Sequence, residues 1–185
     1  MSRPSWTAAI VVLAACGGKE KVATFVGSES CTGCHAAEGE RWRNSHHALA
    51  MQVARDSTLL GDWDGASVED AGVVTRFTRD AEGARVTTQG PDGREATFTP
   101  VYTFGVHPLQ QVLLPLSRGR LQALSVAWDA RPATAGGSRW YHLYDGDSIR
   151  AGHPLHWTSR ELNWNYQCAE CHSTDVRKGY VAASL

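Results

Sequence analysis

The chain has few of the features that define several large classes of protein. Its formal net charge is −1, so no basic field indicates nucleic-acid binding. Its apolar stretch at residues 8–13 is far too short for a membrane-spanning helix, which needs about 20 apolar residues. No internal repeat with a period of about 20–50 residues is present, and no segment is of low complexity. Function must therefore be sought in individual motifs.

Cysteine is scarce, with five residues in 185, and four of the five form two motifs of one design. These are Cys31-Thr32-Gly33-Cys34-His35 and Cys168-Ala169-Glu170-Cys171-His172. The C-x-x-C-H pattern is the attachment signature of c-type haem, in which the thiols add to the two porphyrin vinyl groups and the histidine ligates the iron. The sequence predicts two haem c groups with His35 and His172 as proximal ligands.

A C-x-x-C pair alone is also found in thioredoxin-type redox motifs, in zinc sites and in disulfides. A redox motif needs a βαβ context, and a zinc ribbon usually keeps its two pairs close together, whereas these pairs lie at 31–34 and 168–171. None of the three alternatives predicts a histidine at the same offset in both pairs. Haem attachment is therefore the favoured interpretation.

The fifth cysteine, Cys16, closes a segment that is typical of an export signal. A basic start at Arg3 and an apolar stretch precede Leu13-Ala14-Ala15-Cys16, which resembles a bacterial lipobox, in which the cysteine is lipidated. We expect residues 1–15 to be a lipoprotein signal peptide, 16–23 a tether, and the protein to be anchored at the periplasmic face of a bacterial membrane. An ordinary cleaved signal peptide is the alternative. Both export the chain, which suits c-type haem because bacteria attach it outside the cytoplasmic membrane.

The rest of the chain divides into three predicted segments. Residues 24–60 form the first haem-binding segment, 61–145 a small β-rich insert and 146–185 the second haem-binding segment. We expect 24–185 to be one α+β domain of mostly short helices and loops around two haems, with a small inserted antiparallel β-sheet. In the first segment, helices are predicted over 36–42 and, capped by Ser45, from 46 to about 55.

The insert carries the signals of β-hairpins. Alternating residues over 73–78 and 84–88 flank a turn at 80–83, and Pro91-Asp92-Gly93 turns the chain towards 96–98. Further strands are predicted over 122–128 and 140–144.

The sixth ligand of each iron must come from a small set. Two of the eight histidines are proximal, and Met51 is the one methionine left after a signal peptide is removed. Bis-histidine ligation is therefore favoured, and it gives a lower potential than a histidine–methionine pair. His47 is the first choice, over the iron of His35, because the break at Asn44-Ser45 lets the chain return over the porphyrin. The other distal candidates are His46, His142 and His156. The alternative for the His46-His47 pair is a surface pair at a helix start, and His142 and His156 can equally be plain core or surface histidines.

Several segments carry a resemblance to known cytochromes. Residues 26–35 and 42–51 look like the opening of exported multihaem cytochromes related to the tetrahaem cytochrome of the hydroxylamine pathway. Residues 102–111, 139–144 and 155–174 are similar to a bacterial group in which such a region precedes tetratricopeptide repeats. Members of that group usually continue into a third C-x-x-C-H segment, so the resemblance implies that this chain is a truncated form.

These observations favour an electron-transfer protein over an enzyme. No nucleophile–base pair, glycine-rich phosphate loop or carboxylate dyad stands out in the sequence. We expect the chain to carry electrons between redox protein partners outside the cytoplasmic membrane. The alternatives are a haem enzyme acting on small nitrogen compounds or peroxide at a five-coordinate iron, and a haem-based sensor. The sixth ligand of the iron distinguishes these three functions, because a low-spin iron that does not bind carbon monoxide is typical of an electron carrier.

The lipoprotein interpretation predicts that Cys16→Ser releases the exported protein from the membrane. Cell fractionation should find wild type in the membrane fraction and the variant soluble in the periplasm. Wild type that is already wholly soluble would contradict lipidation.

Overall fold

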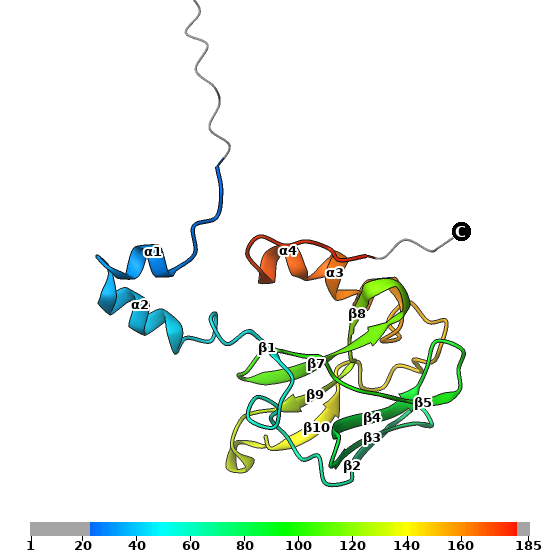
Figure 1. Cartoon of the computed structure of the whole chain (residues 1–185). Helices are drawn as coiled ribbons and strands as arrows, with labels where there is room; N and C mark the ends of the chain where they lie inside the picture. The colour runs from blue at the N-terminus through cyan, green and yellow to red at the C-terminus, as the bar shows by residue number, and fades with distance from the viewer. Residues whose placement is uncertain (1–22, 181–185) are drawn as a thin grey trace, which may run out of the picture.

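The computed structural model describes residues 23–180, and the body of this part of the chain is made of two antiparallel β-sheets (Figure 1). Four short helices lie outside the sheets: α1 (Glu29–Thr32), α2 (Ala36–Arg43), α3 (Trp164–Gln167) and α4 (Ala169–His172). None of these helices is long and apolar enough to cross a membrane. Cys16, the predicted signal peptide and most of the predicted tether lie outside the described residues.

The smaller sheet is a run of consecutive hairpins. Its strands are β2 (Ala66–Asp70), β3 (Val73–Asp80), β4 (Gly83–Gln89) and β5 (Glu95–Phe98). The hairpins predicted around 80–83 and 91–93 are confirmed. At the first of them the Asp80 carboxylate accepts a hydrogen bond of 2.8 Å from the Glu82 amide, which closes the tight turn.

The larger sheet has the strand order β1-β6-β7-β9-β10, with β8 paired to the other half of β7. Its strands are β1 (Met51–Val53), β6 (Tyr102–Phe104), β7 (Leu109–Leu116), β8 (Arg120–Ala123), β9 (Val126–Asp129) and β10 (Arg139–His142). The single strand predicted over 122–128 is two strands, because β8 pairs with the end of β7 at Leu113–Leu116 and β9 with its start at Leu109 and Gln110. The chain crosses between them at Leu124 and Ser125.

Aromatic side chains join the two sheets. Phe77 of β3 stacks on Trp140 of β10 with ring centroids 3.7 Å apart and an interplanar angle of 3°. Trp63 meets both rings edge-on, at 5.4 Å and 5.3 Å. All three side chains are buried, so they exclude water from the interface between the sheets.

The larger sheet is buried on both faces. Val112 and Leu114 of β7 belong to the core between the sheets, whereas Leu113 packs against Trp164 and Ala169 of the C-terminal helices. Successive residues of a strand point to opposite faces, which explains why β7 is apolar along nearly its whole length. The second C-x-x-C-H segment is thereby attached to the sheet.

The expected α+β fold, with helices and loops dominant and the sheet a small insert, is wrong. The described chain is mostly β, and the sheets form its body. The physical reason is that the apolar residues of the middle segment alternate with period two and bury both faces of a sheet, while the two haem motifs each occupy only one or two helical turns.

The helix predicted from 46 to about 55 is also absent. The Ser45 hydroxyl accepts a hydrogen bond of 3.2 Å from the Ala48 amide, so a single turn is capped as expected. The chain then becomes extended, because β1 pairs with the edge of β6, with Met51 opposite Phe104 and Val53 opposite Tyr102. Sheet pairing therefore overrides the local helical preference. The helix predicted over 36–42 is confirmed as α2.

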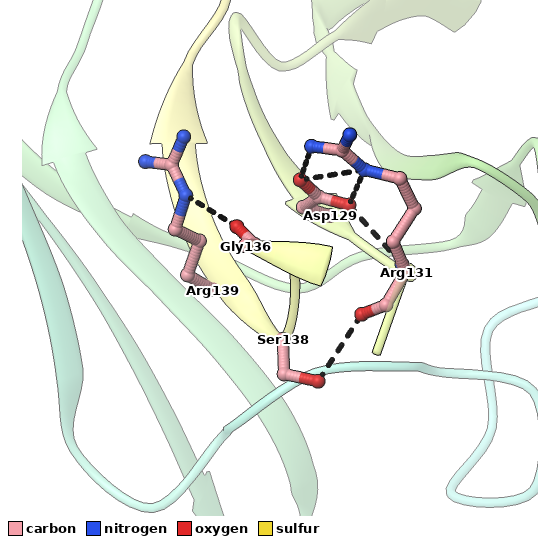
Figure 2. Close-up of polar contacts among 5 residues, drawn as sticks. All are labelled: Asp129, Arg131, Gly136, Ser138 and Arg139. Carbon is pink, nitrogen blue, oxygen red and sulfur yellow. Dashed lines mark hydrogen bonds and ion pairs between the residues drawn. The ribbon is translucent and has the colours of Figure 1, made fainter. Parts of the chain in front are cut away.

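A bidentate ion pair braces the loop between β9 and β10 (Figure 2). Arg131 donates from Nε and Nη2 to the Asp129 carboxylate, at 2.9 Å to Oδ1 and 2.6 Å to Oδ2. These hydrogen bonds lower the pKa of Asp129 from its ordinary value of 3.8 to about 2. In the rest of the loop, the Ser138 hydroxyl donates a hydrogen bond to the Arg131 carbonyl, and Arg139 Nε donates to the Gly136 carbonyl.

This pair predicts a defined acid dependence of stability. The pKa of Asp129 is lower in the folded state, so the stabilisation is complete above about pH 4 and is lost as the pH falls through about 2. Arg131→Gln should lower the urea midpoint at neutral pH, and the difference from wild type should shrink between these two pH values. Asp129→Asn should behave in the same way. Midpoint differences that stay constant over this pH range would contradict the assignment.

Candidate haem-binding sites

The two C-x-x-C-H segments adopt the same backbone turn. In the first, the Cys31 carbonyl accepts hydrogen bonds from the amides of Cys34 at 3.2 Å and His35 at 3.0 Å. In the second, the Cys168 carbonyl accepts from Cys171 at 3.2 Å and from His172 at 3.1 Å. Residues three and four apart on a helical turn share a face, so this hydrogen-bond pattern keeps the two cysteines and the histidine of each segment close together along the chain.

All four of these cysteines are free thiols. In residues 23–180 no three histidine, cysteine, aspartate or glutamate side chains gather into a group that could hold a metal ion. Two free thiols and an adjacent histidine on one turn fit the covalent attachment of a porphyrin.

The first motif stands on an exposed helical arm. No residue of α1 or α2 is buried, and Figure 1 shows both helices set apart from the sheets. A hollow of about 280 Å³ lies beside the first motif, and its lining residues include Cys31, His35 and Trp42. Trp42 is 51% exposed, which is unusual for so large an apolar side chain. The arm thus offers an apolar surface that a haem face could cover.

The second motif rests on the larger sheet. Ala169 is fully buried against the cluster of Leu113, Ala123 and Trp164, and Cys168 packs beside it. The ring of Phe104 on β6 meets the His172 ring edge-on at 5.0 Å. Burial raises the pKa of the Cys168 thiol, and the neighbouring Cys171 adds to the shift.

Side chains far from the second motif in sequence line a hollow of about 370 Å³ beside it. His172 shares this hollow with His47, Met51, Tyr102 and Trp42. His47 was predicted to face the iron of His35, but it does not line the hollow of His35. Trp42 lines both hollows, so it connects the surroundings of the two motifs.

The candidates His142 and His156 lie together elsewhere, around a small cavity between the two sheets. The cavity has room for about one water molecule, and no residue of either C-x-x-C-H segment lines it. His142 Nε2 is 3.1 Å from the Ser125 hydroxyl, and His156 Nδ1 is 2.8 Å from the Thr158 hydroxyl. Burial lowers the pKa of His156 to about 4, with His142 and His153 adding to the shift. The structure thus brings neither residue to a haem motif.

The remaining distal candidate, His46, is exposed and lies at the surface beside His107, with ring centroids 5.5 Å apart. Sequence reasoning missed Trp42 and Phe104 as residues of the candidate sites. Trp42 follows the first motif by less than two helical turns, and that spacing could have placed it beside His35. Phe104 carries no comparable signal, because only the pairing of β1, β6 and β7 brings it to His172.

Comparison with known proteins agrees with this chemistry. Residues 30–96 match the family described as cytochrome c554 and c-prime, a region that includes the first C-x-x-C-H motif. No curated protein and no solved structure matches the chain. The match supports a c-type cytochrome, and with it haem c as the cofactor and electron transfer as the type of function.

Proposed function

We propose that the chain is an exported, lipid-anchored cytochrome that carries electrons through two covalently bound haems. The observation that carries this proposal is the shared pattern of backbone hydrogen bonds at the two C-x-x-C-H segments, each with two free thiols and an adjacent histidine. Cys31, Cys34 and His35 would hold one haem, and Cys168, Cys171 and His172 the other. A bound haem supplies an iron that takes up and releases one electron.

His47 is the distal ligand that the geometry favours for the second haem. It lines the hollow of His172, and within the described residues it is the one other histidine that does so. Ligation by two histidines would leave no open position for a substrate on this iron, which suits a carrier. Met51 lies in the same hollow from β1, where its flexible side chain would pack against the porphyrin.

The arrangement of the two motifs supports transfer between the haems. Trp42 lines both hollows, so this one side chain would belong to the surroundings of both haems. The helical arm that carries the first motif is exposed along its length, and it therefore offers a surface to redox protein partners. The lipid at Cys16 would keep the domain at the membrane where such partners meet it.

The haem count tests the proposal directly. Protein produced with a haem-maturation system should keep two haems per chain after denaturation, as measured by intact mass. Cys171→Ala should weaken attachment at the second site alone, and Cys34→Ala at the first alone. A mass that shows one haem or none in wild type would refute the proposal that the chain binds two haems.

The axial assignment predicts a change of spin state. His47→Ala should convert the haem bound at Cys168 and Cys171, about half of the total haem signal, from low-spin to high-spin, because ligation by imidazole is lost. Electron paramagnetic resonance of the oxidised protein measures this change. His46→Ala is the matched control, since His46 does not line the hollow, and it should leave the spectrum unchanged. A larger effect of His46→Ala than of His47→Ala would reverse the assignment.

A further inference from the structure

A third hollow, of about 400 Å³, lies beside α3 and shares no lining residue with the two haem hollows. Three arginines from two parts of the chain line it. Arg118 lies in the turn between β7 and β8, Arg120 begins β8, and Arg160 lies in the segment before α3. Tyr166 and Tyr180 complete its rim. We call this hollow the arginine pocket.

The wall of the arginine pocket is formed by the buried side-chain amides of Gln122 and Asn163, which are hydrogen-bonded within the protein. Gln122 and Asn163 are 1% and 5% exposed. Asn163 Nδ2 donates to Gln122 Oε1 at 2.7 Å, and Gln122 Nε2 donates to the carbonyls of Trp157 and Ser159 at 2.8 Å and 2.7 Å. Tyr180 donates its hydroxyl to Asn163 Oδ1 at 2.7 Å. The wall is therefore held by its own hydrogen bonds. Arg120 donates to the Ser117 carbonyl and hydroxyl at 3.2 Å and 3.3 Å, and Arg160 donates to the Tyr166 hydroxyl at 3.3 Å. The other N–H groups of the guanidinium groups are the donors left for a ligand.

The positive charges of the arginine pocket have no counterions in the described part of the chain. No carboxylate in residues 23–180 forms an ion pair with Arg118, Arg120 or Arg160. Glu161, next to Arg160, accepts instead from Gln167 at 3.2 Å. Arg160 and Lys178 both lie over the Tyr166 ring, at 5.0 Å and 4.9 Å from its centroid, so a further cation stands at the rim.

The backbone is strained where it brings Arg118 to the arginine pocket. Arg118 has φ 64°, a left-handed conformation that favours glycine. The next residue, Gly119, has no room for a side chain, because a Cβ there would meet the carbonyl of Gly179. Asn165 ties the same two segments together by donating to the carbonyls of Gly119 at 3.1 Å and Lys178 at 2.6 Å. Strain held in place by its surroundings is typical of binding sites.

We propose that the arginine pocket binds a small, multiply charged oxyanion that carries phosphate or carboxylate groups. Guanidinium groups match both kinds of group with paired hydrogen bonds, and three of them around one hollow favour a ligand with more than one negative charge. The volume of the hollow exceeds that of a single inorganic ion, so an organic anion fits it. The tyrosine rim offers such a ligand an apolar surface. The site shares no lining residue with the two haem hollows.

Isothermal titration calorimetry of the holoprotein tests the proposal with two probes, pyrophosphate for phosphate groups and citrate for carboxylates. At least one should bind saturably to wild type, and the preferred probe identifies the ligand chemistry. Arg118→Gly and Arg160→Gln should each weaken binding about tenfold or more, since each removes a charged donor. Arg94→Gln is the control, because Arg94 does not line the pocket, and it should bind like wild type.

Two further readouts make the test decisive. Arg118→Gly should keep the thermal midpoint of wild type or raise it, since glycine adopts φ 64° without strain, so lost binding cannot be ascribed to misfolding. The haem spectrum should be unchanged in both pocket variants. The proposal is overturned if neither probe binds wild type saturably, or if both pocket variants bind as wild type does. Retention on a polyglutamate column without binding of either small anion would also overturn it, in favour of an acidic protein partner.

Discussion

The packing of Phe77 against Trp140 is the interaction on which the rest of the structure depends. It holds the four-stranded sheet against β10, and through β9 it fixes β7, the strand that pairs with three others. The opposite face of β7 and β8 is then available for Trp164 and Ala169. The position of the second C-x-x-C-H turn therefore follows from an aromatic core on the far side of the same sheet.

The two candidate haem sites differ in how many buried contacts hold them to the rest of the protein. The second is held by buried contacts and by the edge-on contact of Phe104 with His172. The first is carried by helices with no buried residue, and its large apolar side chain, Trp42, is half exposed. Burial of apolar surface is what stabilises an element against its neighbours. A porphyrin bound at the first motif would supply the apolar face that this arm lacks, so haem binding and folding would be coupled there.

Local signals in the sequence were sufficient for the motifs and for the hairpins. The two C-x-x-C-H segments, the helix after the first of them and the turns around 80–83 and 91–93 depend on residues close together in the chain, so their patterns could be recognised. The change from helix to strand at Met51 depends on β6, about 50 residues later, and no local pattern contains that partner. The same limit explains the split between β8 and β9, and why the hollow that His47 lines together with His172 has no local signal in the sequence. Of the aromatic neighbours of His142, Trp140 packs in the core between the sheets rather than beside a C-x-x-C-H segment.

We propose that two haems occupy neighbouring sites and exchange electrons, and a reversible redox titration of the holoprotein, followed by haem absorption, distinguishes this arrangement from a single haem. We expect two electrons per chain. We also expect the midpoint potential of the haem bound at Cys168 and Cys171 to shift when Cys31→Ala and Cys34→Ala remove the first haem, since a nearby charge stabilises one oxidation state over the other. One electron per chain, or a potential that does not change when the first haem is removed, would contradict the proposal.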